Sequence, residues 1–225
     1  LGEYGNQPGS VEHAENGLLM GLDNWLYSAK SNRRLRLVEG RLVEEPTLFR
    51  GQWGITQDNE GQLYYNTNSS FLRGDLYDAQ PIIEAGNASA PGLNIRVSRD
   101  DQVFAVRVNP GVNRAYVPGV LREDGRLDKP TSASGMAVYR GGLSLQGERD
   151  VYVAEPAANV VVRLKLNADG LQASTEHVLY DDETWGQREF LASTDERFRP
   201  VDVSVGPDGA LYVVDMYRGI IQDQV

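Results

Sequence analysis

The sequence predicts an all-β protein with the architecture of a β-propeller. Three observations lead to this prediction. A hairpin pattern recurs along the 225 residues, its copies lie about one propeller blade apart, and several copies are followed by a further pair of strands. Four strands per repeat is the composition of a propeller blade.

The clearest copy of the hairpin lies near the end of the sequence. Val201, Val203 and Val205 alternate with polar residues, which is the period of a half-buried strand. Residues 206–209, Gly-Pro-Asp-Gly, supply a turn, and the apolar residues 211–214 follow. This segment therefore predicts two antiparallel strands joined by a tight turn.

Four earlier segments show the same pattern in outline. Their paired strands are predicted at residues 18–20 and 25–29, 54–56 and 63–65, 94–97 and 103–106, and 136–139 and 151–154. The second strands of the five copies begin at Leu26, Leu63, Val103, Val151 and Leu211, so the intervals are 37, 40, 48 and 60 residues. A propeller blade takes roughly 40 to 50 residues. We therefore expect about five blades of a six-bladed ring.

Outer strand pairs complete several of these units. They are predicted at residues 34–38 with 41–43, 113–118 with 122–127, and 160–166 with 177–180. A two-sheet sandwich would also contain many short strands between turns, and the repeat period favours the propeller over it.

The fifth hairpin has no outer pair within this sequence. An open ring would leave strand edges exposed, so we expect residues 1–225 to form a single propeller domain that belongs to a longer chain or pairs with another one. The sequence starts at Leu1 without a basic, apolar leader, which suggests a mature or excised piece.

The composition restricts the chemistry of the chain. There is no cysteine, which excludes disulfides, thiolate catalysis, Cys-ligated zinc or iron–sulfur centres and covalent c-type haem within this segment. The formal net charge of −10 argues against binding to nucleic acid or anionic membranes. No apolar run is long enough for membrane insertion.

Two candidate site residues precede the first two hairpins, where loops open toward the central channel of a propeller. His13, flanked by Glu12, could act as a general base, or it could be a hydrogen-bonding loop histidine. Arg50 could pair with a ligand carboxylate while Trp53 stacks on the ligand. The alternative is that Arg50 forms an ion pair between two blades and that the Trp53 indole packs in the core.

Two more candidates, Arg197 and Arg199, precede the last hairpin. In an extended segment, residues two apart point to the same side, so both guanidiniums would face one anionic ligand. Local pairing with Asp195 and Glu196 is the alternative. Residues 64–70 are rich in oxygen-bearing side chains that could bind calcium or simply form an ordinary loop, so the metal ligands are unknown.

These motifs together resemble the glucose/sorbosone dehydrogenase family. The resemblance rests on His13 after an acidic residue, on Arg50 before the second hairpin, and on the Arg-x-Arg of Arg197 and Arg199 before a Pro-Asp-Gly hairpin. It extends over nearly the whole chain. The closest similarity is to the "membrane-bound dehydrogenase domain" branch, whose members often carry a cytochrome c domain and are usually exported.

The resemblance implies a six-bladed propeller that binds pyrroloquinoline quinone (PQQ), with calcium as a possible second cofactor, and oxidises sugars. His13 would be the catalytic base, and Arg50, Arg197 and Arg199 would bind the cofactor. A cytochrome c domain or protein would accept the electrons, in the periplasm or outside the cell. The chain departs from the family pattern at residues 155–159, which lack the expected lysine, and at Gly51, where asparagine is common.

The leading interpretation is therefore PQQ-dependent oxidation of a sugar or aldehyde. A non-catalytic propeller that binds a glycan or a protein is the alternative. A lactonase-like hydrolase is a third interpretation, which requires carboxylates that converge on a metal in the channel.

Overall fold

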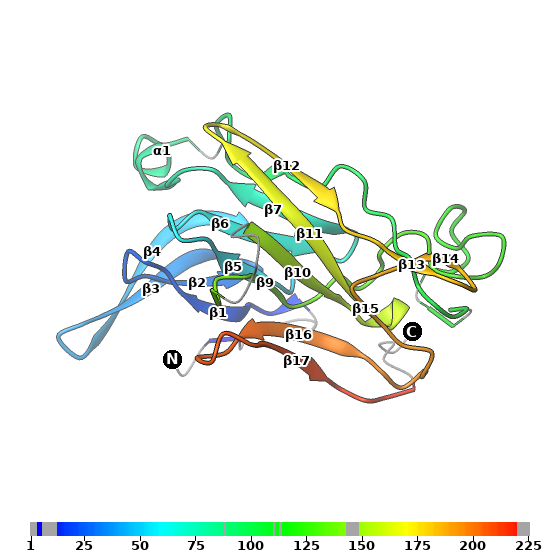
Figure 1. Ribbon diagram of the computed structural model, residues 1–225. Helices are drawn as coiled ribbons and strands as arrows, with labels where there is room; N and C mark the ends of the chain where they lie inside the picture. The colour runs from blue at the N-terminus through cyan, green and yellow to red at the C-terminus, as the bar shows by residue number, and fades with distance from the viewer. Residues whose placement is uncertain are drawn as a thin grey trace.

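The structure, a computed structural model, describes residues 4–5, 13–87, 89–109, 111–112, 114–142 and 149–219. These residues form 17 short strands, one α-helix (α1, Gln80–Glu84) and a 3-10 helix (η2, Pro156–Ala158). Within this part of the chain, no helix has the length and apolar character needed to cross a membrane. The prediction of an all-β fold is confirmed (Figure 1).

Three antiparallel sheets and a hairpin make up the body of the protein. The first sheet contains β1 (Asn16–Met20), β2 (Leu26–Ala29), β3 (Ser31–Val38) and β4 (Arg41–Arg50). The second contains β5 (Ile55–Gln57), β6 (Leu63–Thr67), β7 (Ser70–Asp75) and β8 (Ile95–Arg96). The third contains β9 (Met136–Val138), β10 (Arg149–Glu155), β11 (Val160–Asp169) and β12 (Gln172–His177), and β15 (Leu191–Ala192) pairs with β11. The hairpin joins β16 (Pro200–Val205) to β17 (Leu211–Asp215), and a separate small hairpin joins β13 (Tyr180–Asp182) to β14 (Gly186–Arg188).

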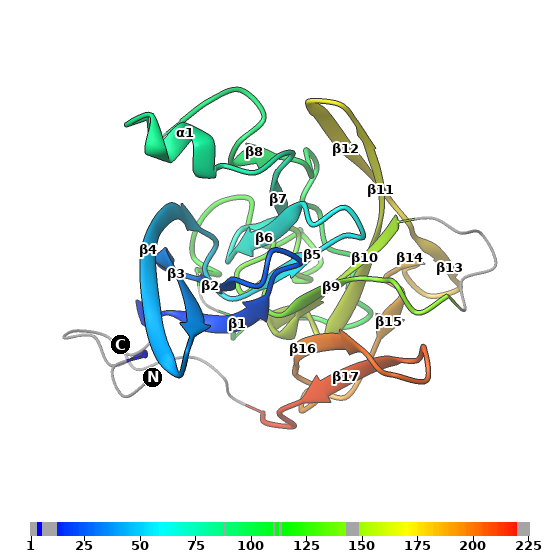
Figure 2. The same cartoon turned by 90° about the vertical axis from the view of Figure 1, so that its left-hand side faces the viewer.

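The three sheets and the β16–β17 hairpin are arranged as propeller blades. Their first strands, β1, β5, β9 and β16, lie side by side in chain order, and the other strands of each blade extend outward from them (Figure 2). These four strands line one cavity, which is the channel of the propeller. The predicted β-propeller is therefore the fold of the chain.

Apolar side chains between successive blades hold this arrangement together. Trp25, Tyr27, Ile55 and Tyr65 pack between the first and second blades. A larger cluster that includes Tyr64, Phe71, Leu72, Val151 and Val162 joins the second and third blades. A third cluster, with Tyr152 and Val203, joins the third blade to the β16–β17 hairpin. Burial of each large side chain contributes about 1.5–3 kcal/mol, so these clusters stabilise the packing of one blade on the next.

Four of the five predicted hairpins are confirmed, and the third is wrong. Residues 95–96 are instead the outer strand β8 of the second blade, paired with β7. Residues 103–106 form no strand, although Val103 and Ala105 are fully buried. Their carbonyl oxygens accept hydrogen bonds from the guanidiniums of Arg122 and Arg126. The apolar alternation correctly indicated burial, but it did not indicate where the backbone would find its hydrogen-bond partners.

The predicted outer hairpin at residues 113–127 is also wrong. Turns occupy this region, and its only ladder contact among the described residues is an isolated bridge between Leu121 and Leu127. Residues 97–131 therefore form a long connection between the second and third blades. The described residues contain three four-stranded blades and the β16–β17 hairpin, where we expected five units.

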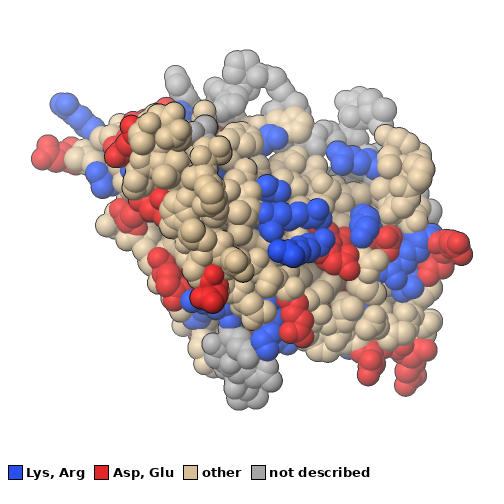
Figure 3. All heavy atoms as spheres, turned by 90° about the horizontal axis from the view of Figure 1, so that it is seen from above, with Lys and Arg blue, Asp and Glu red and all other residues tan. Residues whose placement is uncertain are grey.

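Basic and acidic side chains are interspersed on the surface. On the face seen in Figure 3, basic side chains gather near the centre with acidic ones next to them. The negative net charge is thus not spread evenly over the molecule.

Candidate functional site

The candidate site is the channel, a cavity of about 1340 Å³ between the inner strands. Glycines allow the blades to meet closely at one end of it. A Cβ atom on Gly54 would lie 2.6 Å from the carbonyl oxygen of Ser134, and one on Gly135 would lie 2.6 Å from the Cα atom of Asp202. Because larger residues would push the blades apart, these glycines set the width of the channel.

Arg199 forms a positively charged wall of this channel. Its side chain is only 8% exposed, and it donates to the carbonyl oxygens of Pro156 (2.7 Å), Arg218 (3.1 Å) and Gly219 (2.8 Å). No described carboxylate forms an ion pair with it. Desolvation, and next the positive charge of Arg107, lower the pKa of Arg199, but arginine stays protonated at all ordinary pH values. The charge is therefore bonded to carbonyl dipoles, and the carboxylates of Glu196 and Glu155 act on it only from beyond ion-pair distance.

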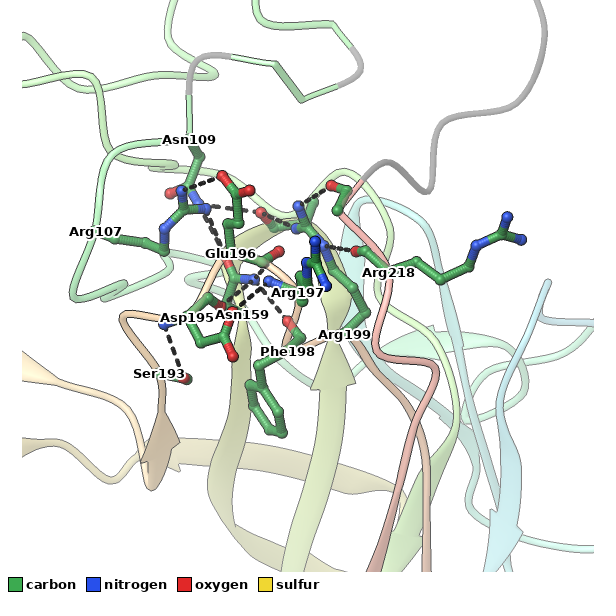
Figure 4. A network of polar contacts seen from close by, with 12 residues as sticks. Arg107, Asn109, Asn159, Ser193, Asp195, Glu196, Arg197, Phe198, Arg199 and Arg218 are labelled. Carbon is green, nitrogen blue, oxygen red and sulfur yellow. Dashed lines mark hydrogen bonds and ion pairs between the residues drawn. The ribbon is translucent and has the colours of Figure 1, made fainter.

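Arg107 brings a second positive charge to the same end of the channel. Its Nη1 donates to Asn159 Oδ1 at 3.2 Å, and its Nη2 lies 3.7 Å from the exposed Glu196 carboxylate. Figure 4 shows Arg107, Glu196 and Asn159 turned toward one another beside Arg199, while the Arg218 side chain extends away. We call the pair Arg107 and Arg199 the cationic end of the channel.

Asn159 organises the backbone at the cationic end. It adopts a left-handed conformation with φ 62°, which asparagine tolerates better than most residues. Its amide donates to the carbonyl oxygens of Asp195 (3.3 Å), Glu196 (3.2 Å) and Phe198 (2.6 Å). This one side chain fixes the loop that leads into β16 and thereby places Arg199.

Glu155 lies beneath the channel wall and is fully buried. It accepts hydrogen bonds from the hydroxyl (2.8 Å) and backbone N–H (3.2 Å) of Ser132 and from the backbone N–H of Ala157 (3.1 Å). Burial raises the pKa of Glu155 to about 7, although these hydrogen bonds oppose the shift. Its carboxyl group caps η2, whose first two residues supply carbonyl oxygens to Arg199.

The structure does not bring the four predicted site residues together. His13 is exposed and does not line the channel. Arg50 is buried in an ion pair with Asp75, with 2.6 Å between Arg50 Nε and Asp75 Oδ2, and it also donates to Thr47 and the Leu48 carbonyl. Arg50 does not line the channel, and its ion pair holds β4 to β7 of the next blade, as the alternative interpretation of this residue expected.

Arg197 and Arg199 point to different environments. A turn at Asp195–Phe198 replaces the expected extended segment, because the Phe198 N–H donates to the Asp195 carbonyl at 3.2 Å. Arg199 is consequently buried at the channel while Arg197 is exposed and does not line it. The prediction that the two guanidiniums face one ligand is wrong for this reason. Trp53 does line the channel and donates from Nε1 to Asn68.

In the predicted calcium loop, residues 64–70, the side chains of Asn66 and Asn68 form hydrogen bonds within the protein. Asn66 Oδ1 accepts from the Gly54 N–H at 3.0 Å, and its amide donates to the Ser134 carbonyl at 2.5 Å. Asn68 Oδ1 accepts from Trp53. Within the described residues, no group of three or more His, Asp or Glu side chains has the arrangement of a metal site. The asparagines of this loop therefore join the second blade to the third.

Sequence reasoning missed Arg107, Asn159 and Asp202, all of which shape the channel or its wall. Arg107 follows the predicted third hairpin, so its position depended on a unit that does not form. A better signal existed for Asp202, because the polar positions between Val201, Val203 and Val205 had to face something other than the core. In the structure, they face the channel.

Comparison with known proteins identifies the family. Residues 4–225 match DUF7133, a domain of unknown function. The chain belongs to this family. No curated protein matches the chain. A crystal structure of a candidate oxidoreductase (glucose dehydrogenase) from Thermus thermophilus is similar at 18% identity with a TM-score of 0.44. That similarity covers 88% of this DUF7133 chain and 59% of the other one, so this chain spans well under two thirds of that protein.

Proposed function

We propose that the channel binds a quinone that carries several carboxylate groups, of the PQQ type, and that the domain takes part in oxidation of a sugar or aldehyde. The observation that carries this proposal is the buried, positively charged Arg199 on the channel wall, which has no described carboxylate partner. An anionic ligand would supply the missing negative charge.

The residues of the cationic end suit such a ligand. Arg107 and Arg199 would hold carboxylates, Trp53 offers an aromatic face for a flat ring system, and a cavity of about 1340 Å³ can contain a quinone together with a sugar. A bound PQQ would supply a two-electron acceptor. The protein's own contribution would be to fix the carboxylates of the ligand by charge.

The buried Glu155 makes this site weaker than one with the expected lysine. Glu155 lies in the segment where enzymes of the glucose/sorbosone dehydrogenase family have a lysine. Each charge-assisted hydrogen bond that the missing lysine would have made to the ligand is worth about 1.5–3 kcal/mol. The positions of His13 and Arg50 outside the channel favour the second candidate, a non-catalytic propeller that binds a glycan or protein partner. In both proposals the channel remains the binding site.

The resemblance extends the first proposal to the wider protein. Electrons would pass to a cytochrome c domain or another acceptor, and the domain would be periplasmic or secreted. Calcium would accompany the quinone at ligands that are not yet identified. The domain would belong to a longer chain that completes the propeller.

A titration of PQQ with calcium into the folded protein, followed by absorbance, tests the proposal. We expect saturable binding that Arg199→Met or Arg107→Met weakens by about tenfold to 150-fold, the loss of one charge-assisted hydrogen bond. Arg197→Ala is the matched control, because this arginine lies outside the channel. The Arg107 variant separates ligand binding from folding, since Arg107 is only partly buried. Absence of PQQ binding by the wild-type protein would rule out the quinone proposal.

A further inference from the structure

We propose that Asp202 is the group that binds the hydroxyl of a sugar in the channel and accepts its proton during oxidation. This inference deepens the proposed function and rests on it. It assigns to Asp202 the role that the sequence predicted for His13, which lies outside the channel.

The placement of Asp202 follows from the alternation along β16. Val203 is 2% exposed and packs in the cluster between the third blade and the β16–β17 hairpin. Side chains alternate across a strand, so Asp202 and Ser204 face the side opposite to Val203. Both line the channel, as do the other residues of 201–205, because the whole strand borders the cavity. The strand therefore presents a carboxylate and a hydroxyl together to a ligand.

Asp202 is the carboxylate of the channel wall that no described cation neutralises. The other acidic side chain that lines the cavity, Glu196, lies near Arg107. The hydrogen bond given for the Asp202 side chain is the one from the Val203 backbone N–H to Oδ1, at 2.9 Å. Asp202 remains exposed to the channel, and the partial burial of its carboxyl group raises its pKa, which makes it a better proton acceptor than an ordinary aspartate.

Gly135 holds this carboxylate in place. A Cβ atom at position 135 would collide with the Asp202 side chain, and the Gly135 N–H donates to the Val201 carbonyl at 2.9 Å. Asp202 thus rests against the backbone of Gly135, just before β9, and its Oδ1 is oriented by the Val203 N–H. An acceptor oriented in this way would bind a hydroxyl at a small entropic cost.

The position of Asp202 relative to the cationic end fits a ligand pair. Asp202 lies three residues after Arg199, beyond a bulge between Pro200 and Asp202 at the start of β16. A carboxylated quinone held at Arg107 and Arg199 would extend from there along the strand toward Asp202. A neutral polyhydroxylated substrate suits this part of the channel, because a second anion would be repelled by the carboxylate.

The proposed step balances in atoms and electrons. The hydroxyl proton of the sugar would pass to Asp202, and the hydrogen on the same carbon would leave with its electron pair. A bound PQQ would supply the acceptor for these two electrons, the alcohol carbon would become a carbonyl, and Asp202 would later release its proton to water. Asp202 is regenerated as the carboxylate.

Asp202→Asn tests this assignment, because it keeps the side-chain shape and the acceptor for the Val203 N–H. D-glucose, chosen as the probe, is titrated into the protein without quinone and followed by ligand-observed NMR. We expect the variant to bind it about tenfold or more weakly, the loss of a hydrogen bond to a charged group. With PQQ, calcium and an artificial electron acceptor, we expect aldose oxidation to fall by about 10²–10⁴-fold, with loss of the acidic limb of the pH profile. Arg197→Ala is the matched control, because this exposed arginine does not line the channel, and it should leave both readouts unchanged within about twofold.

Two outcomes would overturn the proposal in different ways. PQQ binding and aldose oxidation by the wild type, with both readouts unchanged in Asp202→Asn, would overturn the role of Asp202 and leave the proposed function intact. Failure of the wild type to bind PQQ or oxidise any aldose would overturn the proposed function and, with it, this assignment. PQQ titration of the variant shows that the cationic end is unaffected, since Asp202 lies outside it.

Discussion

Arg50 and Arg199 occupy comparable places in the repeat but have opposite electrostatic environments. Each lies shortly before the inner strand of a blade, and each is nearly buried, at 3% and 8% exposure. Arg50 pairs with the buried carboxylate of Asp75. Arg199 has only carbonyl oxygens as described acceptors. Both arginines join two blades, but Arg50 does so through a carboxylate and Arg199 through carbonyl oxygens, which is why we propose Arg199 as the ligand-binding charge.

The electrostatic environments of Arg50 and Arg199 differ because the neighbouring blade presents different acceptors to each of them. Asp75 ends β7 and also accepts from the Tyr65 hydroxyl at 3.0 Å and the Asn94 N–H at 2.7 Å, so the Arg50 site is a complete polar network. At Arg199 the adjoining element is η2, which presents carbonyl oxygens. A buried arginine is therefore informative about function only when its counter-charge has been accounted for.

The largest expected effect is the loss of the Arg50 ion pair. Arg50→Met would leave Asp75 buried without its positive partner, and the free energy of unfolding should fall by about 3–5 kcal/mol in urea denaturation. Arg50→Met combined with Asp75→Asn should recover part of this loss, because no buried charge is left unpaired. A loss below about 1 kcal/mol in the single variant would contradict the structural role of Arg50.

A pH dependence of stability is expected from Glu155, which lies beneath the cationic end. Its folded-state pKa of about 7 is above the ordinary value of 4.5, so the folded protein binds more protons between these pH values. Its contribution to stability is complete below pH 4.5 and is lost as the pH rises to about 7. Urea denaturation at several pH values should show this fall. Glu155→Gln should remove that part of the slope, and an unchanged slope would show that Glu155 is ionised normally.

A smaller effect on stability is expected at Arg199. Arg199→Met removes hydrogen bonds to carbonyl oxygens but leaves no described carboxylate unpaired, so we expect a loss of about 1.5–3 kcal/mol, less than at Arg50. Urea denaturation of both variants under the same conditions makes the comparison direct. An equal or larger loss at Arg199 would mean that its charge has a structural counter-ion.

The smallest effect is expected at Arg197. Its side chain is exposed, and its backbone N–H donates to Asp195, a bond that substitution of the side chain leaves in place. Arg197→Ala should change stability by less than about 0.5 kcal/mol and PQQ affinity by less than about twofold. A large loss of affinity would show that the segment before β16 rearranges when the ligand binds.

The sequence by itself determined the all-β fold and four of the hairpins, because alternating apolar residues and Gly-containing turns act locally. It also predicted a ligand-binding role for Arg199, which in the structure lines the channel. Local patterns could not predict the environments of His13, Arg50 and Arg197. Arg50, for example, is placed by Asp75, which is distant in the chain, and Arg197 is placed by a turn. The i, i+2 rule failed at Arg197 because the Asp195 turn interrupts the extended backbone.

Tertiary structure alone decided which polar groups share the channel. Arg107 comes from the long connection of residues 97–131, Arg199 from the start of β16, and Asn159 from the end of η2. No local pattern links these three segments, and their meeting depends on how the blades pack. The same packing decided that Asp202 faces a cavity, because the polar side of a strand shows only that a residue avoids the core.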